Sequence, residues 1–178
     1  GRAHAAGWRA AGAELVGVVS QGGVSAKALA EAHGARAFAD LDALMAEVEV
    51  VDLCVPSDLH HPMTLRAAAA GKHVVCEKPI ALSLAHAEEM IAACERAGVR
   101  LFVAHVLRFF PQYRTAAETV RAGHLGRLGV LRFKRVSSPP RAGQASWFAD
   151  EARSGGMICD LMVHDFDYAA MLAGPVRR

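Results

Sequence analysis

The sequence lacks the patterns that mark thiol-dependent, nucleic-acid-binding and membrane-spanning proteins. Its 4 cysteines form no CxxC pair, so a metal or redox motif built on thiols is not indicated. Basic residues exceed acidic ones by only 20 to 18, and no basic block carries interleaved aromatic residues, as nucleic-acid binding would require. Every apolar run falls short of the ~20 residues that a membrane-spanning helix needs. We therefore expect a cytoplasmic protein with neither a nucleic-acid nor a membrane partner.

Lysine is scarce as well, with 4 residues against 16 arginines. Arginine cannot deprotonate at usable pH, whereas the pKa of a lysine can be tuned by its surroundings. One lysine follows a short apolar run, Val74–Cys76, that is typical of a buried strand. Because ligands bind outside the carboxyl ends of strands in open α/β sheets, Lys78 of Glu77-Lys78-Pro79 can meet a substrate there. The alternative is an exposed charged pair that opens a turn.

Strand-like and helix-like segments alternate over the first two-thirds of the chain. Strands are expected over 14–20, 48–55, 72–76 and 100–105, and helices over 1–11, 26–33, 41–47, 62–70 and 84–97. The expected N-caps are Ser25, Asp40 and Ser83. This alternation predicts a Rossmann-like, doubly wound parallel sheet. A strand should precede the first helix, so we expect the sheet to lack its first strand.

The pattern changes near Pro111. Residues 111–122 look helical, and 128–136 alternate in the manner of a strand. We expect a cofactor-binding domain over 1–124, incomplete at its N-terminus, and the start of an α+β substrate domain with a mostly antiparallel sheet over 125–178. Too few elements follow to complete a two-layer domain, so the chain is expected to be cut at both ends.

A second cluster of chemically useful residues contains Asp160 and His164. Their spacing of four places them on one face of a helix. A carboxylate beside an imidazole favours its charged form and orients its tautomer, which suits a general base. A two-ligand metal pair is an alternative, but no third ligand is evident nearby and we expect no metal. In another alternative, Asp160, Asp165 and Asp167 only favour the dipole of a helix N-terminus.

The two clusters, in this order, resemble the Gfo/Idh/MocA oxidoreductases, which are nicotinamide-dependent dehydrogenases of sugars, inositols and related compounds. The resemblance extends over nearly the whole chain. The stretches that carry it are Gly1–Ala5, Cys54–His60, Gly71–Pro79, His105–Tyr113, Trp147–Asp150 and the Asp160–His164 pair. The resemblance implies that Lys78 lies between the nicotinamide and the substrate hydroxyl. It also implies that His164 takes the hydroxyl proton, while Asp160 positions His164 and hydrogen-bonds the substrate.

The resemblance further implies NAD or NADP as cofactor. The expected cofactor contacts are Gly1, Arg2, Ser20, Pro56, Ser57, His60, Glu77 and Lys78. The expected substrate contacts are Arg108, Trp147, Asp160 and His164. Arg108 could instead be structural, and Trp147 could pack between domains. Of the G-x-G-x-x-G phosphate loop only the presumed last glycine, Gly1, is present.

Ser20 stands where NAD enzymes usually carry the acidic residue that binds the ribose 2′-hydroxyl and repels a 2′-phosphate. We therefore expect a slight preference for NADP. The predicted reaction is the reversible oxidation of a sugar or polyol hydroxyl by a protein that is homo-oligomeric at full length. The alternatives are a non-catalytic nucleotide- or sugar-sensing protein of the same fold and an inactive gene fragment.

Overall fold

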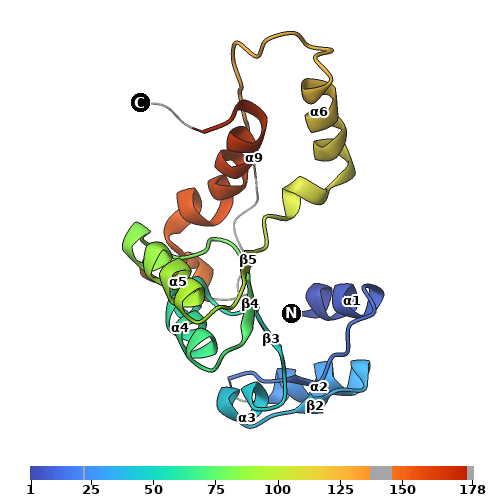
Figure 1. Ribbon diagram of the computed structural model, residues 1–178, viewed down its shortest axis with the longest axis vertical. Coiled ribbons are helices and arrows are strands. Elements are labelled where there is room, and N and C mark those ends of the chain that lie inside the picture. The colour runs from blue at the N-terminus through green and yellow to red at the C-terminus, as the bar shows by residue number, and fades with distance from the viewer. Residues whose placement is uncertain (22, 137–145, 176–178) are drawn as a thin grey trace.

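The computed structural model describes residues 1–21, 23–136 and 146–175. Its first hundred residues alternate strands and helices, as predicted, and form the lower part of the molecule (Figure 1). The strands are β1 (Gly17–Val18), β2 (Arg36–Ala37), β3 (Val50–Leu53), β4 (His73–Cys76) and β5 (Leu101–Val103). The helices are α1 (Arg2–Ala10), α2 (Val24–His33), α3 (Leu41–Met45), α4 (His60–Ala69) and α5 (Leu84–Arg96).

Every strand pairing in the described part of the chain is parallel, which confirms the predicted α/β class. Strand β1 pairs with β2, and a separate sheet has the order β3-β4-β5, with Leu53 opposite Cys76 and Cys76 opposite Val103. A Rossmann sheet has the strand order 3-2-1-4-5-6, so its first strand separates two such groups. The observed division therefore matches the expected sheet without its first strand. The short, exposed β2 was not predicted, because Arg36 and Ala37 carry no apolar alternation.

The core lies on the three-stranded sheet. Val74 and Cys76 of β4 have 0% exposure and Leu53 of β3 has 1%. The buried cluster around them consists of Leu41, Met45, Val51, Leu53, Ala67, Val74, Cys76 and Met90. Burying such side chains contributes about 1.5–3 kcal/mol each. The rigid core therefore holds the carboxyl ends of β3 and β4, from which the candidate site residues extend.

Two of the three predicted helix caps are confirmed. The side chain of Asp40 accepts a hydrogen bond from the Ala43 backbone N–H at 2.8 Å, and Ser83 accepts one from His86 at 3.2 Å. The third is wrong, because Ser25 lies inside α2. Gly23, with φ of 74°, is the N-cap.

Gly23 has no side chain to cap α2, and Ser20, three residues earlier, caps the helix instead. The Ser20 hydroxyl oxygen accepts from the Ala26 backbone N–H at 3.1 Å, and Ser25 donates to the same oxygen at 2.9 Å. Ser20 therefore anchors the start of α2 to the end of β1.

The last third of the chain is largely helical. It comprises η2 (Val106–Phe109), α6 (Pro111–Arg121), α7 (Ser146–Ala149), α8 (Glu151–Ser154), the π-helix η3 (Ile158–Met162) and α9 (Val163–Ala173). The strand expected over 128–136 is wrong: this described segment has no ladder partner, and its residues form no sheet. Alternation alone makes no strand without a neighbouring backbone to satisfy its polar groups. Accordingly, the expected antiparallel sheet is not found within the described residues.

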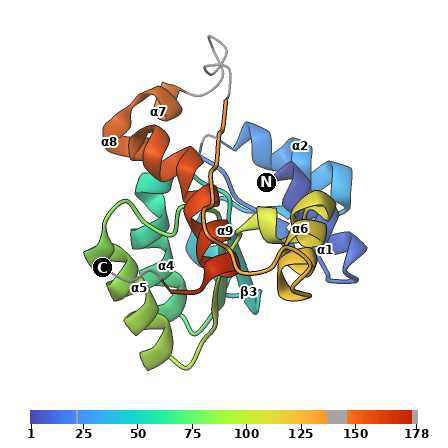
Figure 2. The same ribbon diagram turned by 90° about the horizontal axis from the view of Figure 1, so that it is seen from above.

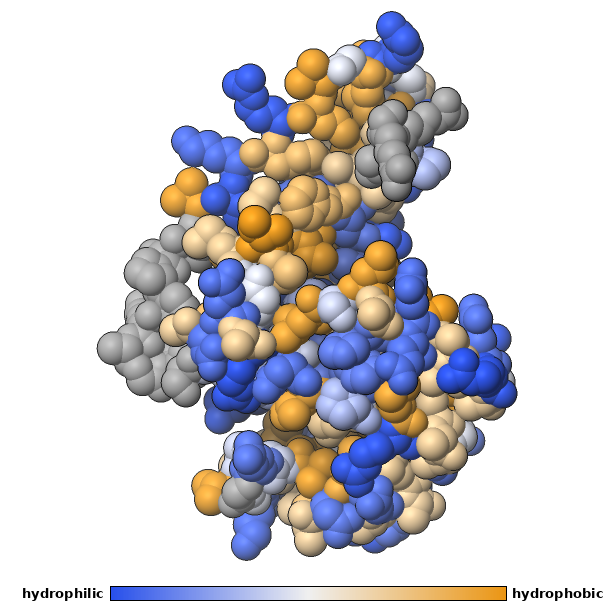
Figure 3. Space-filling model, turned by 90° about the vertical axis from the view of Figure 1, so that its left-hand side faces the viewer, coloured by the Kyte–Doolittle hydropathy of each residue, from blue (hydrophilic) through white to orange (hydrophobic). Residues whose placement is uncertain are grey.

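Helix α9 lies above the three-stranded sheet in Figure 1 and in front of it in Figure 2, which is seen from above. Apolar side chains gather in the upper half of the face drawn in Figure 3, where the C-terminal third lies. The exposed large apolar residues of this third include Leu125, Val130, Phe133, Val136, Phe148, Met157, Ile158 and Phe166. Among the described residues, no helix has the length and apolar character to cross a membrane.

Candidate active site

An ion pair joins the two residue clusters that the sequence singled out. Lys78 follows β4, and Asp160 lies in the π-helix that leads into α9. The Lys78 Nζ donates to Asp160 Oδ1 at 2.7 Å and to the Asp160 carbonyl oxygen at 2.6 Å. Both side chains are largely buried, with exposures of 16% and 17%. Because these contacts span 82 positions, they bind the C-terminal third to the end of the sheet.

The Glu77-Lys78-Pro79 loop is held at each of its residues. Glu77 Oε1 lies 3.0 Å from His4 Nε2, and its Oε2 accepts from the Lys78 backbone N–H at 3.0 Å. The Pro79 carbonyl oxygen lies 2.8 Å from His60 Nδ1, and the Lys78–Pro79 peptide bond is cis. These hydrogen bonds hold the loop, and the Lys78 side chain extends from it to Asp160 of η3.

His60 ties together the loops that follow β3 and β4. Its side chain has 1% exposure, with Nδ1 at the Pro79 carbonyl and Nε2 3.1 Å from the Val55 carbonyl. Ser57, which was expected beside it at the cofactor, is 3% exposed, and Pro56 precedes the η1 turn (Ser57–Leu59) as its N-cap. Both His60 nitrogens face carbonyl oxygens, so the structure assigns His60 a supporting contact. Its direct contact with a cofactor stays a prediction.

His164 lies in the first turn of α9 and is half-buried. Its Nδ1 is buried and has no hydrogen-bond partner in the described part of the chain. Burial lowers the pKa of His164, the charges of Lys78 and Arg135 lower it further, and Asp160 opposes them weakly. The imidazole is therefore held in the neutral form, which can accept a proton.

Asp160 does not orient His164 in the way that the sequence predicted. No hydrogen bond joins their side chains, both of which lie in the described part of the chain, because the Asp160 carboxylate binds Lys78 instead. Residues four positions apart do not share a face here, because η3 is a π-helix up to Met162. Its wider turn shifts the residues that share a face.

Arginine–aspartate pairs surround His164 and His105. Arg108, expected to bind substrate, donates through Nε to Asp167 Oδ2 at 2.8 Å. Arg135 donates to Asp165 at 2.7 and 3.0 Å. The hydrogen bonds to these carboxylates raise the pKa of each arginine. Each pair therefore fixes α9 to an earlier segment.

His105 was not selected from the sequence as a site residue. Its Nδ1 is buried 3.7 Å from Asp167 Oδ2, beyond hydrogen-bond distance. Burial lowers the pKa of His105, Asp167 raises it, and the positive charges of Arg108 and Lys78 lower it. The start of the His105–Tyr113 stretch at the end of β5 was the signal that could have found it.

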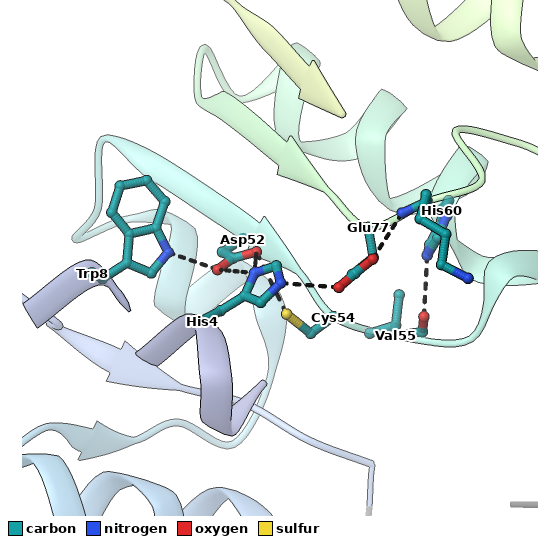
Figure 4. A network of polar contacts seen from close by, with 8 residues as sticks. His4, Trp8, Asp52, Cys54, Val55, His60 and Glu77 are labelled. Carbon is teal, nitrogen blue, oxygen red and sulfur yellow. Dashed lines mark hydrogen bonds and ion pairs between the residues drawn. The ribbon is translucent and has the colours of Figure 1, made fainter. Parts of the chain in front are cut away.

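A second polar cluster, around His4, was also missed. His4 Nδ1 lies 3.0 Å from both carboxylate oxygens of Asp52, whose Oδ2 accepts from the Trp8 indole N–H at 2.6 Å (Figure 4). Its hydrogen bonds to Asp52, Cys54 and Glu77 raise the pKa of His4 to about 12. The four-residue spacing of His4 and Trp8 on one face of a helix was a usable signal, as was a carboxylate within the apolar run of β3.

Three potential metal ligands, His4, Asp52 and Cys54, lie within 4.8 Å of one another. Both imidazole nitrogens already contact carboxylate oxygens. An imidazolium therefore supplies the positive charge that a cation would bring, and the cluster is satisfied by its own side chains.

The start of α1 faces the end of β3. Gly1 is the N-cap of α1, and a Cβ on it would lie 4.0 Å from that of Cys54. Backbone N–H groups at a helix N-terminus favour anions such as phosphates. Arg2, the first residue of α1, is exposed, and Ser20 holds the start of α2 as described. The residues expected at the cofactor thus border the carboxyl edge of the parallel strands.

No contact among the described residues joins Trp147 to Lys78. Trp147 lies in α7, where its ring stacks on Phe148 with 3.8 Å between centroids. The following helix α8 is tied to the loop after β3, because Arg153 donates to Asp58 at 2.9 Å. Contact of Trp147 with a substrate stays a prediction.

Comparison with known proteins agrees with this architecture. Residues 1–105 match the model of an oxidoreductase family with an NAD-binding Rossmann fold, and residues 113–178 match the GFO/IDH/MocA C-terminal domain. The 1,5-anhydro-D-fructose reductase of Ensifer adhaerens is 35% identical over 89% of this chain and 49% of its own length. The Myo-inositol 2-dehydrogenase of Thermotoga maritima is 36% identical over 71% of this chain and 36% of its own length.

Solved structures show the same likeness. The crystal structure of GenD2 from gentamicin A biosynthesis, in complex with NAD, has a TM-score of 0.86 and 30% identity over 98% of this chain and 51% of that chain. This chain therefore spans about half the length of the proteins that it matches. The resemblance drawn from the sequence is confirmed, and the chain belongs to the Gfo/Idh/MocA family of oxidoreductases.

Proposed function

We propose that this chain provides the cofactor-binding and catalytic groups of an NAD(P)-dependent dehydrogenase that oxidises a hydroxyl of a sugar or polyol. The observation that carries the proposal is the contact of Lys78 Nζ with Asp160 at 2.7 Å, with His164 one turn further along the chain. Family membership supports the reaction class. The names of relatives, which include reductases and dehydrogenases of anhydrofructose and inositol, support the substrate class.

The residues at the carboxyl edge of the parallel strands suit the parts of a nicotinamide cofactor. Backbone N–H groups at the start of α1 suit the pyrophosphate, and Ser20 suits the adenosine ribose. Pro56, Ser57 and Glu77 border the edge near Lys78, where the nicotinamide is expected. When bound, the nicotinamide cofactor accepts the hydride from the substrate carbon.

The protein residues manage the proton and the developing negative charge. Lys78 donates a hydrogen bond to the substrate hydroxyl, which stabilises the charge that grows on oxygen as its proton leaves. The neutral His164 takes that proton and becomes an imidazolium. The alcohol and the oxidised cofactor thus become a carbonyl compound and the reduced cofactor, with the released proton on His164. The lowered pKa of His164 keeps it ready to accept a proton at neutral pH. Asp160 fixes Lys78 and accepts a second substrate hydroxyl.

We infer that NADP is accepted at least as well as NAD. Ser20 carries no charge, so it does not repel a 2′-phosphate, and its oxygen is already anchored to Ala26 at 3.1 Å. We also propose a homo-oligomer, in which the exposed apolar residues of the C-terminal third are covered. Light scattering on the complete protein tests the oligomer, and a monomer would refute it.

A hydride-transfer assay tests the proposed function. The complete protein is incubated with NAD⁺ or NADP⁺ and a panel of polyols, aldoses and inositols, and the absorbance of reduced nicotinamide is followed. We expect turnover with at least one cyclic polyol or sugar. Tight nucleotide binding without turnover across the panel would refute the enzyme and favour a sensing protein of the same fold.

A further inference from the structure

His4 stands where three elements meet. It extends from α1 and lies between Asp52 of β3 and Glu77, which follows β4 (Figure 4). The distances from its two ring nitrogens to the carboxylate oxygens are all 3.0 Å. Side-chain exposures of 19% for His4, 19% for Asp52 and 31% for Glu77 show that water solvates this cluster poorly. Each charged group of the cluster therefore needs a charged or hydrogen-bonding partner close by.

Only an imidazolium satisfies both carboxylates. A neutral imidazole donates from one nitrogen and accepts at the other, so one carboxylate would face a lone pair. The hydrogen bond from His4 lowers the pKa of Glu77. Burial raises the pKa of Asp52, but the hydrogen bonds from His4 and Trp8 outweigh it and the net shift is downward. These directions agree with a cationic His4 between two anions.

Among the described residues, no lysine or arginine contributes to the pKa shift of His4. Trp8, on the same helix, donates its indole N–H to Asp52, and Cys54 of the β3 end lies 3.6 Å from Asp52. Cys76 stays a thiol, since burial raises its pKa to about 12. Lys78 directs its ammonium away, to Asp160. His4 therefore supplies the positive charge for this side of the loop.

Glu77 carries the effect of His4 to the backbone of Lys78. One carboxylate oxygen of Glu77 contacts His4, and the other accepts the Lys78 backbone N–H at 3.0 Å. The chain of contacts thus runs from α1 through Glu77 to the residue that meets the substrate. Its first member lies on the helix whose N-terminus is proposed to bind the cofactor pyrophosphate.

We propose that His4, as an imidazolium held between Asp52 and Glu77, is a positioning residue that fixes Lys78 through Glu77 and couples it to the cofactor-binding end of α1. This inference rests on the proposed function for its kinetic consequence. It concerns a residue that touches neither the substrate nor Asp160. Its loss lets Glu77 rotate away and leaves the Asp52 and Glu77 carboxylates without the cation that both of them contact.

Two substitutions of His4 separate its two contacts. An amide at His4→Gln reaches as far as Nε2 and can still donate to Glu77, whereas the shorter His4→Asn mimics Nδ1 and reaches only Asp52. We expect His4→Asn to lower kcat on the order of 10- to 100-fold, as small misplacements of a reacting group do, with little change in the KM for substrate. His4→Gln should recover most of this loss. The matched control is His61→Asn, on a histidine that pairs with Glu89.

A double substitution tests the route through Glu77. In the Glu77→Gln background, His4→Asn should cost little more than Glu77→Gln alone, because residues that act through one contact are not additive. Additive losses would overturn the route. Equal kcat values for His4→Asn and His61→Asn would overturn the positioning role itself.

A spectroscopic measurement keeps the inference separate from the proposed reaction. Nitrogen-15 NMR of histidine side chains in the complete protein should show His4 doubly protonated at about pH 8.5, where an unperturbed histidine is neutral. Imidazolium signals in a protein without hydride transfer would refute the dehydrogenase and leave the charge assignment standing. A neutral His4, or stoichiometric Zn²⁺ binding that His4→Gln abolishes, would overturn the imidazolium. The wild-type spectrum decides this even where a variant fails to fold.

Discussion

The Lys78 ammonium and the Asp160 carboxylate lie 2.7 Å apart although 82 positions separate them in the sequence. The pair joins the loop after β4 to the π-helix before α9. It also places a hydrogen-bond donor near the imidazole of His164, whose Nδ1 has no hydrogen-bond partner among the described residues. The catalytic proposal depends on this relationship more than on any single residue.

Replacement of Lys78 by methionine removes the donor that stabilises the developing alkoxide. We expect kcat to fall on the order of 10²–10³-fold or more, the usual cost of one such donor, while the nucleotide still binds. Steady-state kinetics on the complete protein measures the loss. The matched control, Lys134→Met at an exposed position, should retain normal turnover. Near-normal kcat in Lys78→Met would contradict the assigned role.

The pH dependence of oxidation should report His164. Burial and the charge of Lys78 lower its pKa below the ordinary 6.5, so the neutral base persists into mild acid. As the pH falls through that lowered pKa, the imidazole of the free enzyme is protonated and kcat/KM declines. The profile should therefore show an acid limb with an apparent pKa below 6.5. His164→Asn should lose the limb and about 10²–10⁴-fold in rate.

The same electrostatic coupling has a second readout. Lys78→Met removes a positive charge that lowers the pKa of His164, so the NMR titration of this histidine should move upward in the variant. An unchanged or downward midpoint would show that Lys78 does not act on His164.

The sequence singled out candidate residues that follow strand ends, and their catalytic roles stay predictions. Lys78 was found because an apolar run ends abruptly in charged residues, and the order of the strands then fixes which edge it occupies. His164 was found through its spacing from Asp160, but that spacing gave the wrong contact. A π-helix cannot be read from residue type, because no side-chain pattern distinguishes its wider turn.

The His4 cluster was not predicted because His4 is 48 positions from Asp52 and 73 positions from Glu77 in the sequence. The spacing of His4 and Trp8 and the carboxylate within β3 were signals, but neither one identifies the partner, which only the sheet brings beside α1. The strand predicted over 128–136 was wrong for the opposite reason. Its alternation is local, but a strand depends on a partner that the local sequence does not specify.

His60 should matter chiefly for stability. It is 1% exposed and joins two loops through the carbonyl groups of Val55 and Pro79. His60→Ala removes both contacts and leaves a cavity, for which we expect a loss of about 2–4 kcal/mol in the free energy of unfolding. Urea denaturation of the complete protein measures it. His61→Ala, one residue further and 20% exposed in its side chain, should cost less than half as much. Equal costs would show that the two loops do not depend on His60.

Ser20 should govern the choice between the two nicotinamide cofactors. Ser20→Asp brings a carboxylate that can bind the ribose 2′-hydroxyl of NADH and that repels the 2′-phosphate of NADPH. The carboxylate can still accept the Ala26 N–H that Ser20 accepts at 3.1 Å, so α2 keeps its anchor. We expect the Kd of NADPH to rise about tenfold or more, equal to ~1.4 kcal/mol, while that of NADH falls or stays constant.

Ser20→Ala is the control for this change, because it removes the anchor without adding charge and should weaken both cofactors alike. Fluorescence titration of the complete protein with NADPH and NADH gives the Kd of each cofactor. Dividing the Kd of each of the two variants by that of the wild type yields four ratios. A strong preference of the wild type for NADH would contradict the expected use of NADP. An equal response of both cofactors to Ser20→Asp would show that the 2′-position lies away from the end of β1.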